Sequence, residues 1–138
     1  MATRTDARRA VISILFAKDS GNEDAIKLQD AFFEEQKIRN KQRIFAKELL
    51  DGTVEHLESL DTLISGKLKE WDMERIGRVE KAVLRLGAYE IKHTDTDLPI
   101  IINEALNITK QIAADESPKF INGILDAQIG RASCRERV

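Results

Sequence analysis

Apolar residues recur every three or four positions along most of this chain, which is the spacing of side chains on one face of an α-helix. The first helical segment covers residues 7–16, and its apolar stripe consists of Ala7, Val11, Ile14 and Leu15, with Ala10 beside it. Residues 20–22 (SGN) predict the end of this helix, because glycine readily adopts the left-handed conformation that follows helix termini.

The same spacing predicts further helices at about residues 22–35, 37–57, 60–68, 78–90 and 99–112, and a last one beginning at Ser117. Gly52 is expected to mark a break, because a glycine weakens a helix interior by about 1 kcal/mol. Pro99 and Pro118 suit first turns, where the missing N–H has no intrahelical partner anyway. No segment alternates with the period of a strand. The sequence therefore predicts an all-α fold of about seven helices in a single compact domain, residues 1–128.

The composition is typical of one globular domain. The chain has 138 residues, of which 42% are hydrophobic and 33% are charged, a mixture that can form and surround a core. No run of about 18 apolar residues predicts a membrane-spanning helix, and residues 1–9 lack the apolar stretch of a signal peptide. A single Cys excludes a disulfide framework and a site of several thiolates. A cytoplasmic location without membrane contact is therefore expected.

The segment 129–138 differs from the sequence before it. The apolar spacing stops after Leu125, and the letters IGRASCRERV match one reading frame of a common sequencing adapter. We therefore expect this segment to derive from adapter DNA and exclude it from fold reasoning, the alternative being a native basic tail. Without it the formal net charge changes from −2 to −4, and the single cysteine, Cys134, is lost.

The sequence contains no pattern that supports catalysis, a cofactor or a metal site. His56 and His93 lack the spacing of metal ligands. A glycine-rich phosphate loop and a Gly-x-Ser-x-Gly element are both absent from the sequence. The chain is therefore not expected to be an enzyme.

Basic residues near the N-terminus form the first candidate binding site. Arg4, Arg8 and Arg9 accompany a single acid, Asp6, within residues 1–9. Arg4 and Arg8 are four positions apart and therefore share a helix face, next to backbone N–H groups that favour anions. This arrangement suits phosphate groups, and a solvated first turn explains it equally well.

A second basic run and one aromatic residue are weaker candidates. The run comprises Lys37, Arg39, Lys41, Arg43 and Lys47, without an acid between them. It is consistent with nucleic-acid binding or with a solvated surface helix. Single-stranded nucleic acid requires cations for its phosphates and aromatic rings for its bases. Phe120 beside Lys119 fits this requirement, and its alternative role is core packing with Ile124.

Three segments in the second half of the chain carry a recognisable pattern. They read RVEKAVLRLGAYE at residues 78–90, INEA at 102–105 and DESPKFINGILD at 115–126. Their order and spacing resemble the NusB family of bacterial transcription antitermination factors, and the basic N-terminal helix is similar to that family as well. The resemblance covers residues 2–128, although the middle of the chain adds little to it.

This resemblance implies an all-helical fold of two packed helical bundles, without catalytic activity or cofactor. NusB-like proteins bind a short single-stranded RNA element, boxA, together with NusE, which is also a protein of the small ribosomal subunit. The pair joins the elongating RNA polymerase complex with other Nus factors and suppresses premature termination, chiefly in ribosomal RNA operons. Members occur as monomers or homodimers, so the resemblance leaves the oligomeric state open.

The resemblance also implies roles for individual residues. RNA binding is implied for Arg4, Arg8, Arg9, Lys119, Phe120 and Glu116. A carboxylate such as that of Glu116 can accept hydrogen bonds from base amino groups. Contact with NusE is implied for Glu74 and Glu80.

One departure from the family pattern lies in the first helix, where Thr5 and Asp6 interrupt a denser arginine cluster. Fewer phosphate contacts mean that RNA binding by the chain alone is expected to be weak and strongly salt-dependent. NusE is then expected to supply part of the affinity.

Two other functions fit the same segments. A NusB-like domain also forms the N-terminal RNA-binding part of certain RNA cytosine methyltransferases, whose catalytic part would be missing here. The third alternative is a purely structural helical scaffold, and its sign would be the absence of RNA binding even in the presence of NusE.

Overall fold

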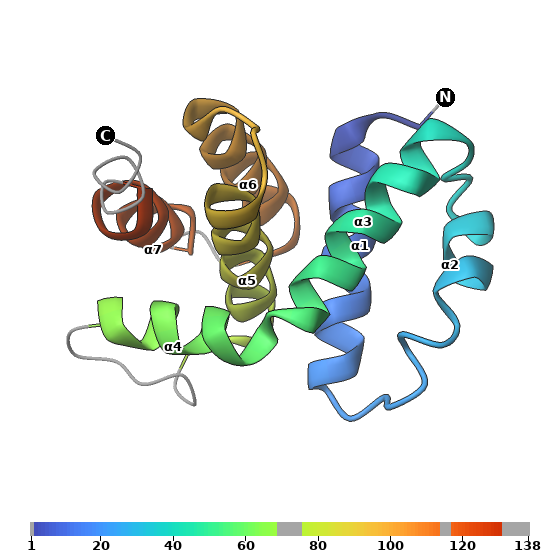
Figure 1. Ribbon diagram of the computed structural model, residues 1–138, viewed down its shortest axis with the longest axis horizontal. Helices are drawn as coiled ribbons and strands as arrows, with labels where there is room; N and C mark the ends of the chain where they lie inside the picture. The colour runs from blue at the N-terminus through green and yellow to red at the C-terminus, as the bar shows by residue number, and fades with distance from the viewer. Residues whose placement is uncertain (1, 69–75, 114–116, 131–138) are drawn as a thin grey trace.

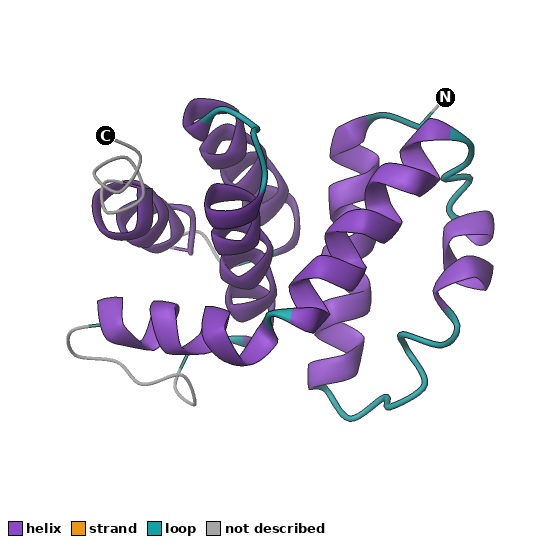
Figure 2. Cartoon of the chain, in the orientation of Figure 1, coloured by secondary structure: helices purple, strands orange, loops and turns teal. Residues whose placement is uncertain are grey.

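The described part of the chain is built of helices joined by short loops. The computed structural model describes residues 2–68, 76–113 and 117–130, the side chains of 127–130 excepted. Its α-helices (Figure 1) are α1 (Arg4–Asp19), α2 (Gln29–Glu35), α3 (Lys41–Glu55), α4 (Leu57–Lys67), α5 (Arg78–His93), α6 (Leu98–Ile112) and α7 (Ser117–Asn122). A π-helix, Gly123–Gly130, follows α7 directly. Within these residues no strand occurs (Figure 2), and the predicted all-α fold is confirmed.

The helices form two bundles that pack side by side (Figure 1). The first bundle consists of α1, α2 and α3, and the second of α4, α5, α6 and α7. The central helix is α5, which contacts α1 and α3 of the first bundle and every helix of the second. Most of its residues between Ala82 and Ile91 are buried. The two bundles therefore share one core and form a single domain, as predicted.

The first helix keeps the apolar stripe and the end that the sequence predicts. Thr3 and Asp6 form a capping box, in which the Asp6 N–H donates to Thr3 Oγ1 at 3.1 Å and the Thr3 N–H donates to Asp6 Oδ2 at 2.9 Å. The helix ends at Asp19, and Gly21 then adopts a φ of +106°, a conformation open to glycine. The predicted stripe from Ala7 to Leu15 is buried.

Two local predictions are wrong. The second helix begins only at Gln29, because Asn22 organises turns before it. The Asp24 N–H donates to the side-chain Oδ1 of Asn22 at 3.2 Å, a bond that competes with helix formation. The break expected at Gly52 does not occur either, since α3 continues to Glu55 and the chain turns at His56. The adapter origin of segment 129–138 stays a prediction, and residues 131–138 lie outside the described residues.

Gly52 allows close packing between α3 and α5. A Cβ added to Gly52 would overlap Oη and Cζ of Tyr89. Both atoms belong to the far end of the Tyr89 side chain, so any side chain at position 52 would require this ring to move. The Tyr89 ring also stacks on His93, with ring centroids 5.3 Å apart, and His93 stacks on His56 at 4.2 Å. The absence of a side chain at Gly52 thus closes the corner between α3, α4 and α5.

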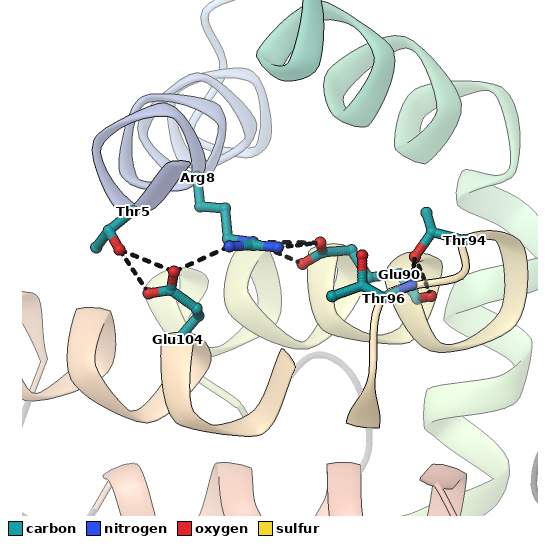
Figure 3. A network of polar contacts seen from close by, with 6 residues as sticks. All are labelled: Thr5, Arg8, Glu90, Thr94, Thr96 and Glu104. Carbon is teal, nitrogen blue, oxygen red and sulfur yellow. Dashed lines mark hydrogen bonds and ion pairs between the residues drawn. The ribbon is translucent and has the colours of Figure 1, made fainter. Parts of the chain in front are cut away.

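A buried ionic network joins the two bundles (Figure 3). Arg8 of α1 is only 2% exposed. Its Nε and Nη2 donate to the carboxylate of Glu90 on α5 at 2.8–3.2 Å, and its Nη1 donates to Oε1 of Glu104 on α6 at 2.9 Å. The Thr5 hydroxyl donates to both carboxylate oxygens of Glu104 at 2.8 Å. One guanidinium and two carboxylates thus fix α1 against the second bundle.

This environment corrects the role that the sequence suggests for Arg8. Arg4 and Arg8 do share a helix face, because their guanidinium carbons lie 4.7 and 5.1 Å from the centroid of the same ring, Phe45. Only Arg4 is exposed on that face. The nitrogens of Arg8 already donate to Glu90 and Glu104 inside the protein. A direct contact between Arg8 and a phosphate does not fit this arrangement.

A second ionic cluster fixes α5 closer to its start. Arg85 donates from Nε and Nη2 to the two carboxylate oxygens of Asp61 on α4, at 2.7 and 2.8 Å, and lies 3.4 Å from Asp19 at the end of α1. Burial alone would lower the pKa of Arg85, but the hydrogen bonds and charges of Asp61 and Asp19 raise this pKa above its ordinary value. The central helix is therefore bound to both bundles through arginine–carboxylate contacts at two levels.

Replacing Gly52 by alanine is expected to destabilise the domain, although alanine is the better helix former. The new Cβ would collide with Tyr89, and we expect this strain to exceed the roughly 1 kcal/mol gained from helix propensity. Gly66 of α4 is the matched control, because a Cβ there meets no described atom within 4 Å. Chemical denaturation should show a lower free energy of unfolding for Gly52→Ala and no loss for Gly66→Ala. Equal values for the two variants would contradict the packing argument.

Replacing Arg8 by methionine is expected to lower the free energy of unfolding by about 3–5 kcal/mol, because Glu90 would remain buried without its cation. Arg9→Met is the control at the neighbouring position, where the pair with Asp6 is partly exposed, and should cost about 1 kcal/mol or less. Adding Glu90→Gln to Arg8→Met should recover part of the loss. Urea denaturation followed by circular dichroism measures all four proteins, and similar losses for Arg8→Met and Arg9→Met would refute the network's role.

Candidate nucleic-acid interface

Arg4 presents an exposed guanidinium at the start of α1. Its position over the Phe45 ring of α3 fixes the side chain without neutralising its charge. Arg4 is also the first residue of α1, and the dipole of a helix favours anions near its N-terminus. This local geometry is suited to a phosphate group.

Arg9 takes part in capping α1. Its Nη1 lies 3.1 Å from Oδ1 of Asp6, and its side chain is 36% exposed. Hydrogen bonds from the Thr3 backbone, and then from Thr3 and Arg9 side chains, hold the pKa of Asp6 below its ordinary value. Arg9 is therefore partly neutralised. The interruption of the basic cluster also has a structural reason, because Asp6 caps the helix and Thr5 binds the second bundle.

The second part of the predicted site lies on α7. Lys119 is exposed, and Phe120 packs against the core while leaving part of its ring accessible. Both α1 and α7 contact α6, which lies between them (Figure 1). The exposed Arg4 and the Lys119-Phe120 pair are therefore held on helices that flank the same third helix.

Glu80 connects α5 with α7. The Ser117 hydroxyl donates to Oε1 of Glu80 at 2.6 Å, and Ser117 is the first residue of α7, as the sequence indicates. Glu80 is half-buried, so part of its carboxylate stays accessible to a partner. The other two acidic candidates, Glu74 and Glu116, lie outside the described residues.

Two acidic residues of α2 form ion pairs with three members of the second basic run. Arg39 and Arg43 bind Glu34, with 2.9 Å between Arg39 Nη2 and Glu34 Oε1, and Lys47 binds Asp30 at 2.9 Å. Hydrogen bonds from these cations hold the pKa values of both acids below their ordinary range. Lys37 and Lys41 have no ion pair within the described part of the chain. The run is therefore neither a uniform basic stripe nor a fully neutralised surface.

A hollow of about 750 Å³ opens beside Arg4, between α1, α3 and the end of α5. The rings of Phe45, Tyr89 and His93 line it, a grouping that the sequence does not reveal because the rings come from different helices. Its acidic lining residues are Glu48, Asp51, Glu55 and Asp95. Burial, followed by the charges of neighbouring glutamates, raises the pKa of Tyr89. We name this the acidic hollow.

The histidines are arranged for stacking. Within the described residues no group of three or more His, Cys, Asp or Glu side chains could hold a metal ion. His56 and His93 instead stack with an interplanar angle of 12°. Burial, together with the proximity of His56, lowers the pKa of His93.

No helix in the described part of the chain is long and apolar enough to cross a membrane.

Known proteins with similar sequences belong to one family. A sequence model described as the NusB family matches residues 5–129. The transcription antitermination protein NusB of Sulfurovum sp. (strain NBC37-1) is 58% identical over 127 residues, which is 92% of this chain and 98% of that protein. Its name favours the antitermination interpretation over the methyltransferase domain.

Two solved structures share the fold. T. maritima NusB matches with a TM-score of 0.86 and 32% identity over 94% of this chain and 92% of that chain. A chain from the crystal structure of the antitermination factors NusB and NusE in complex with double-stranded RNA matches with a TM-score of 0.84 and 32% identity, over 94% of this chain and 96% of that one. From the family match, the sequence identity and the shared fold together, we conclude that this chain belongs to the NusB family.

Proposed function

We propose that this chain is a transcription antitermination factor that binds boxA-type single-stranded RNA together with NusE. In this proposal the pair joins the elongating RNA polymerase complex with other Nus factors, chiefly on ribosomal RNA operons. The observation that supports it most is the similarity to a chain solved with NusB, NusE and RNA. No cofactor takes part, and the site of action is the cytoplasm.

The proposed RNA path crosses α6 from α7 to the start of α1. Arg4 holds a phosphate, Lys119 holds another, and the accessible part of the Phe120 ring stacks a base. Arg8 acts as a positioning residue, because its bonds to Glu90 and Glu104 fix the angle at which Arg4 is presented. Arg9 contributes a partly neutralised cation beside this path, and a contact of Glu116 with RNA remains part of the proposal.

The NusE contact is proposed at Glu74 and Glu80, of which Glu80 lies on α5. The bond from Ser117 ties Glu80 to α7. A partner that binds Glu80 therefore acts on the helix that carries Lys119 and Phe120. This link gives NusE a physical route by which it strengthens RNA binding.

A single strand is the preferred form of RNA in this proposal, although the similar solved complex contains double-stranded RNA. Bases in a duplex are stacked on each other and offer no free face to Phe120, whereas unpaired bases do. A homodimer that covers the α1 and α7 surface would compete with RNA for the same residues.

Fluorescence anisotropy of labelled boxA-type RNA over a salt series tests this function. Binding should be weak for the protein alone and tighter with NusE. Arg4→Gln should reduce the slope of log binding constant against log salt by about 0.7, the value for one phosphate contact on a single strand. Phe120→Leu keeps apolar bulk in the core and should weaken binding by about 1–3 kcal/mol, the contribution of base stacking.

Lys27→Gln is the control, because Lys27 is an exposed cation in the loop between α1 and α2, and it should leave the affinity unchanged. Scrambled and duplex RNA measure selectivity, and thermal unfolding verifies that each variant is folded. If the folded wild-type protein binds boxA-type RNA neither alone nor with NusE, the proposed function is wrong and the scaffold interpretation takes its place.

A further inference from the structure

The start of α1 separates two hollows of opposite character. On one side lies the acidic hollow, in which two cations, Arg4 and Lys47, accompany four carboxylates. On the other side a hollow of about 820 Å³ opens between the start of α1 and the start of α3. This second hollow is lined by Ala2, Asp6, Gln36, Lys37, Arg39, Asn40, Lys41 and Gln42. We name it the basic hollow.

The charges of the basic hollow favour an anionic ligand. Lys37, Arg39 and Lys41 face a single acid, Asp6. The negative charge of Asp6 is already compensated by hydrogen bonds from Thr3 and by its ion pair with Arg9. Arg39 forms an ion pair with Glu34. Among the cations that line this hollow, Lys37 and Lys41 are the ones without an ion pair to a described residue. The first turn of α3 also contains no acidic residue that would oppose an anion.

The position of this hollow makes it a continuation of the proposed RNA path. Figure 1 shows the start of α3 beside the N-terminus of the chain, at the end of the first bundle where α1 begins. Arg4 itself lines the acidic hollow, so a strand that reaches Arg4 from α7 continues either into that hollow or past the start of α1 to the other side. On the acidic side its phosphates would meet Glu48, Asp51, Glu55 and Asp95. Like-charge repulsion therefore directs the backbone to the basic hollow.

We propose that the basic hollow binds the sugar–phosphate backbone of RNA that flanks the boxA-type element, through Lys37 and Lys41. This inference rests on the proposed function and adds a second contact region to it. No aromatic side chain lines the hollow, so it has no platform on which bases stack. Lysine is a flexible point charge without the planar geometry that reads base edges. The phosphate contacts of Lys37 and Lys41 are therefore independent of the sequence of the flank.

The lysines belong to the basic run of residues 37–47, whose sequence is consistent with nucleic-acid binding or with a solvated surface helix. The structure assigns different roles to its members: Arg39, Arg43 and Lys47 bind acids of the first bundle, and Lys37 and Lys41 face the hollow. Lys37 adopts a left-handed backbone with φ of 60°. Asparagine tolerates this conformation better than most residues, which makes Lys37→Asn a suitable neutral replacement.

The test compares a core boxA-type RNA with RNAs extended by several nucleotides at the 5′ or the 3′ end, each with an original and a randomised flank. Wild-type protein with NusE should bind one extended RNA more tightly, with a salt slope steeper by about 0.7 for each added contact. The double variant Lys37→Asn/Lys41→Gln should lose a slope of about 1.4 on that RNA. If the wild type and the double variant bind equally at 1 M salt, this difference in slope makes the binding constant of the double variant about 25-fold lower at 0.1 M salt.

The double variant should bind the core RNA as the wild type does, and randomising the flank should change nothing. Lys18→Gln/Lys27→Gln is the matched control, because Lys18 lies in the last turn of α1 and Lys27 in the loop between α1 and α2, and it should keep the gain from the flank. The single variant Lys41→Gln should lose half of this salt slope, about 0.7, and it leaves Lys37 and its left-handed backbone unchanged.

The outcomes separate this inference from the proposed function. Failure of the wild type to bind even the core RNA with NusE would refute both. Binding of the core RNA without any gain from either flank would refute only the basic hollow, as would an equal gain in wild type and double variant. If the double variant instead loses affinity for NusE in the absence of RNA, the hollow is a protein contact and the inference is wrong.

Discussion

A buried guanidinium is tolerated only where carboxylates surround it, because an unpaired charge in the protein interior costs several kcal/mol. Arg8 belongs to the first bundle, and both of its carboxylates belong to the second. This requirement fixes how the bundles are joined, since neither can rotate or shift without separating the charges. The exposed Arg4 lies one turn before Arg8, and the surface that faces RNA therefore inherits its geometry from the network.

Most of the fold could be predicted from the sequence because helical periodicity and the terminal signals act locally. The stripe from Ala7 to Leu15, the stop after Asp19 and the first-turn Pro99 each depend on residues within a few positions. Gly52 could not be interpreted in this way. Its reason is the Tyr89 ring, which arrives from a different helix, so a weakness in local propensity turned out to be a requirement of packing.

The candidate site could be predicted only in part, for the same reason. The exposed charges of Arg4 and Lys119 follow from their surroundings in sequence. Arg8 looks equivalent to Arg4 in the sequence, and only the distant Glu90 and Glu104 distinguish them. One signal was nevertheless present: Glu90 continues the apolar stripe of Ala82, Val83 and Leu86, and a carboxylate at such a position requires a buried partner.

The distance along the chain between Arg8 and its partners has a consequence for synthesis. Glu90 and Glu104 follow Arg8 by 82 and 96 positions, so the ribosome must add 96 residues after Arg8 before both carboxylates that enclose the guanidinium are present. Until then Arg8 stays hydrated, and α1 has no fixed orientation relative to the second bundle. Contacts of such long range form late in folding. A nascent chain therefore acquires its nucleic-acid surface only after all of its helices up to α6 have emerged.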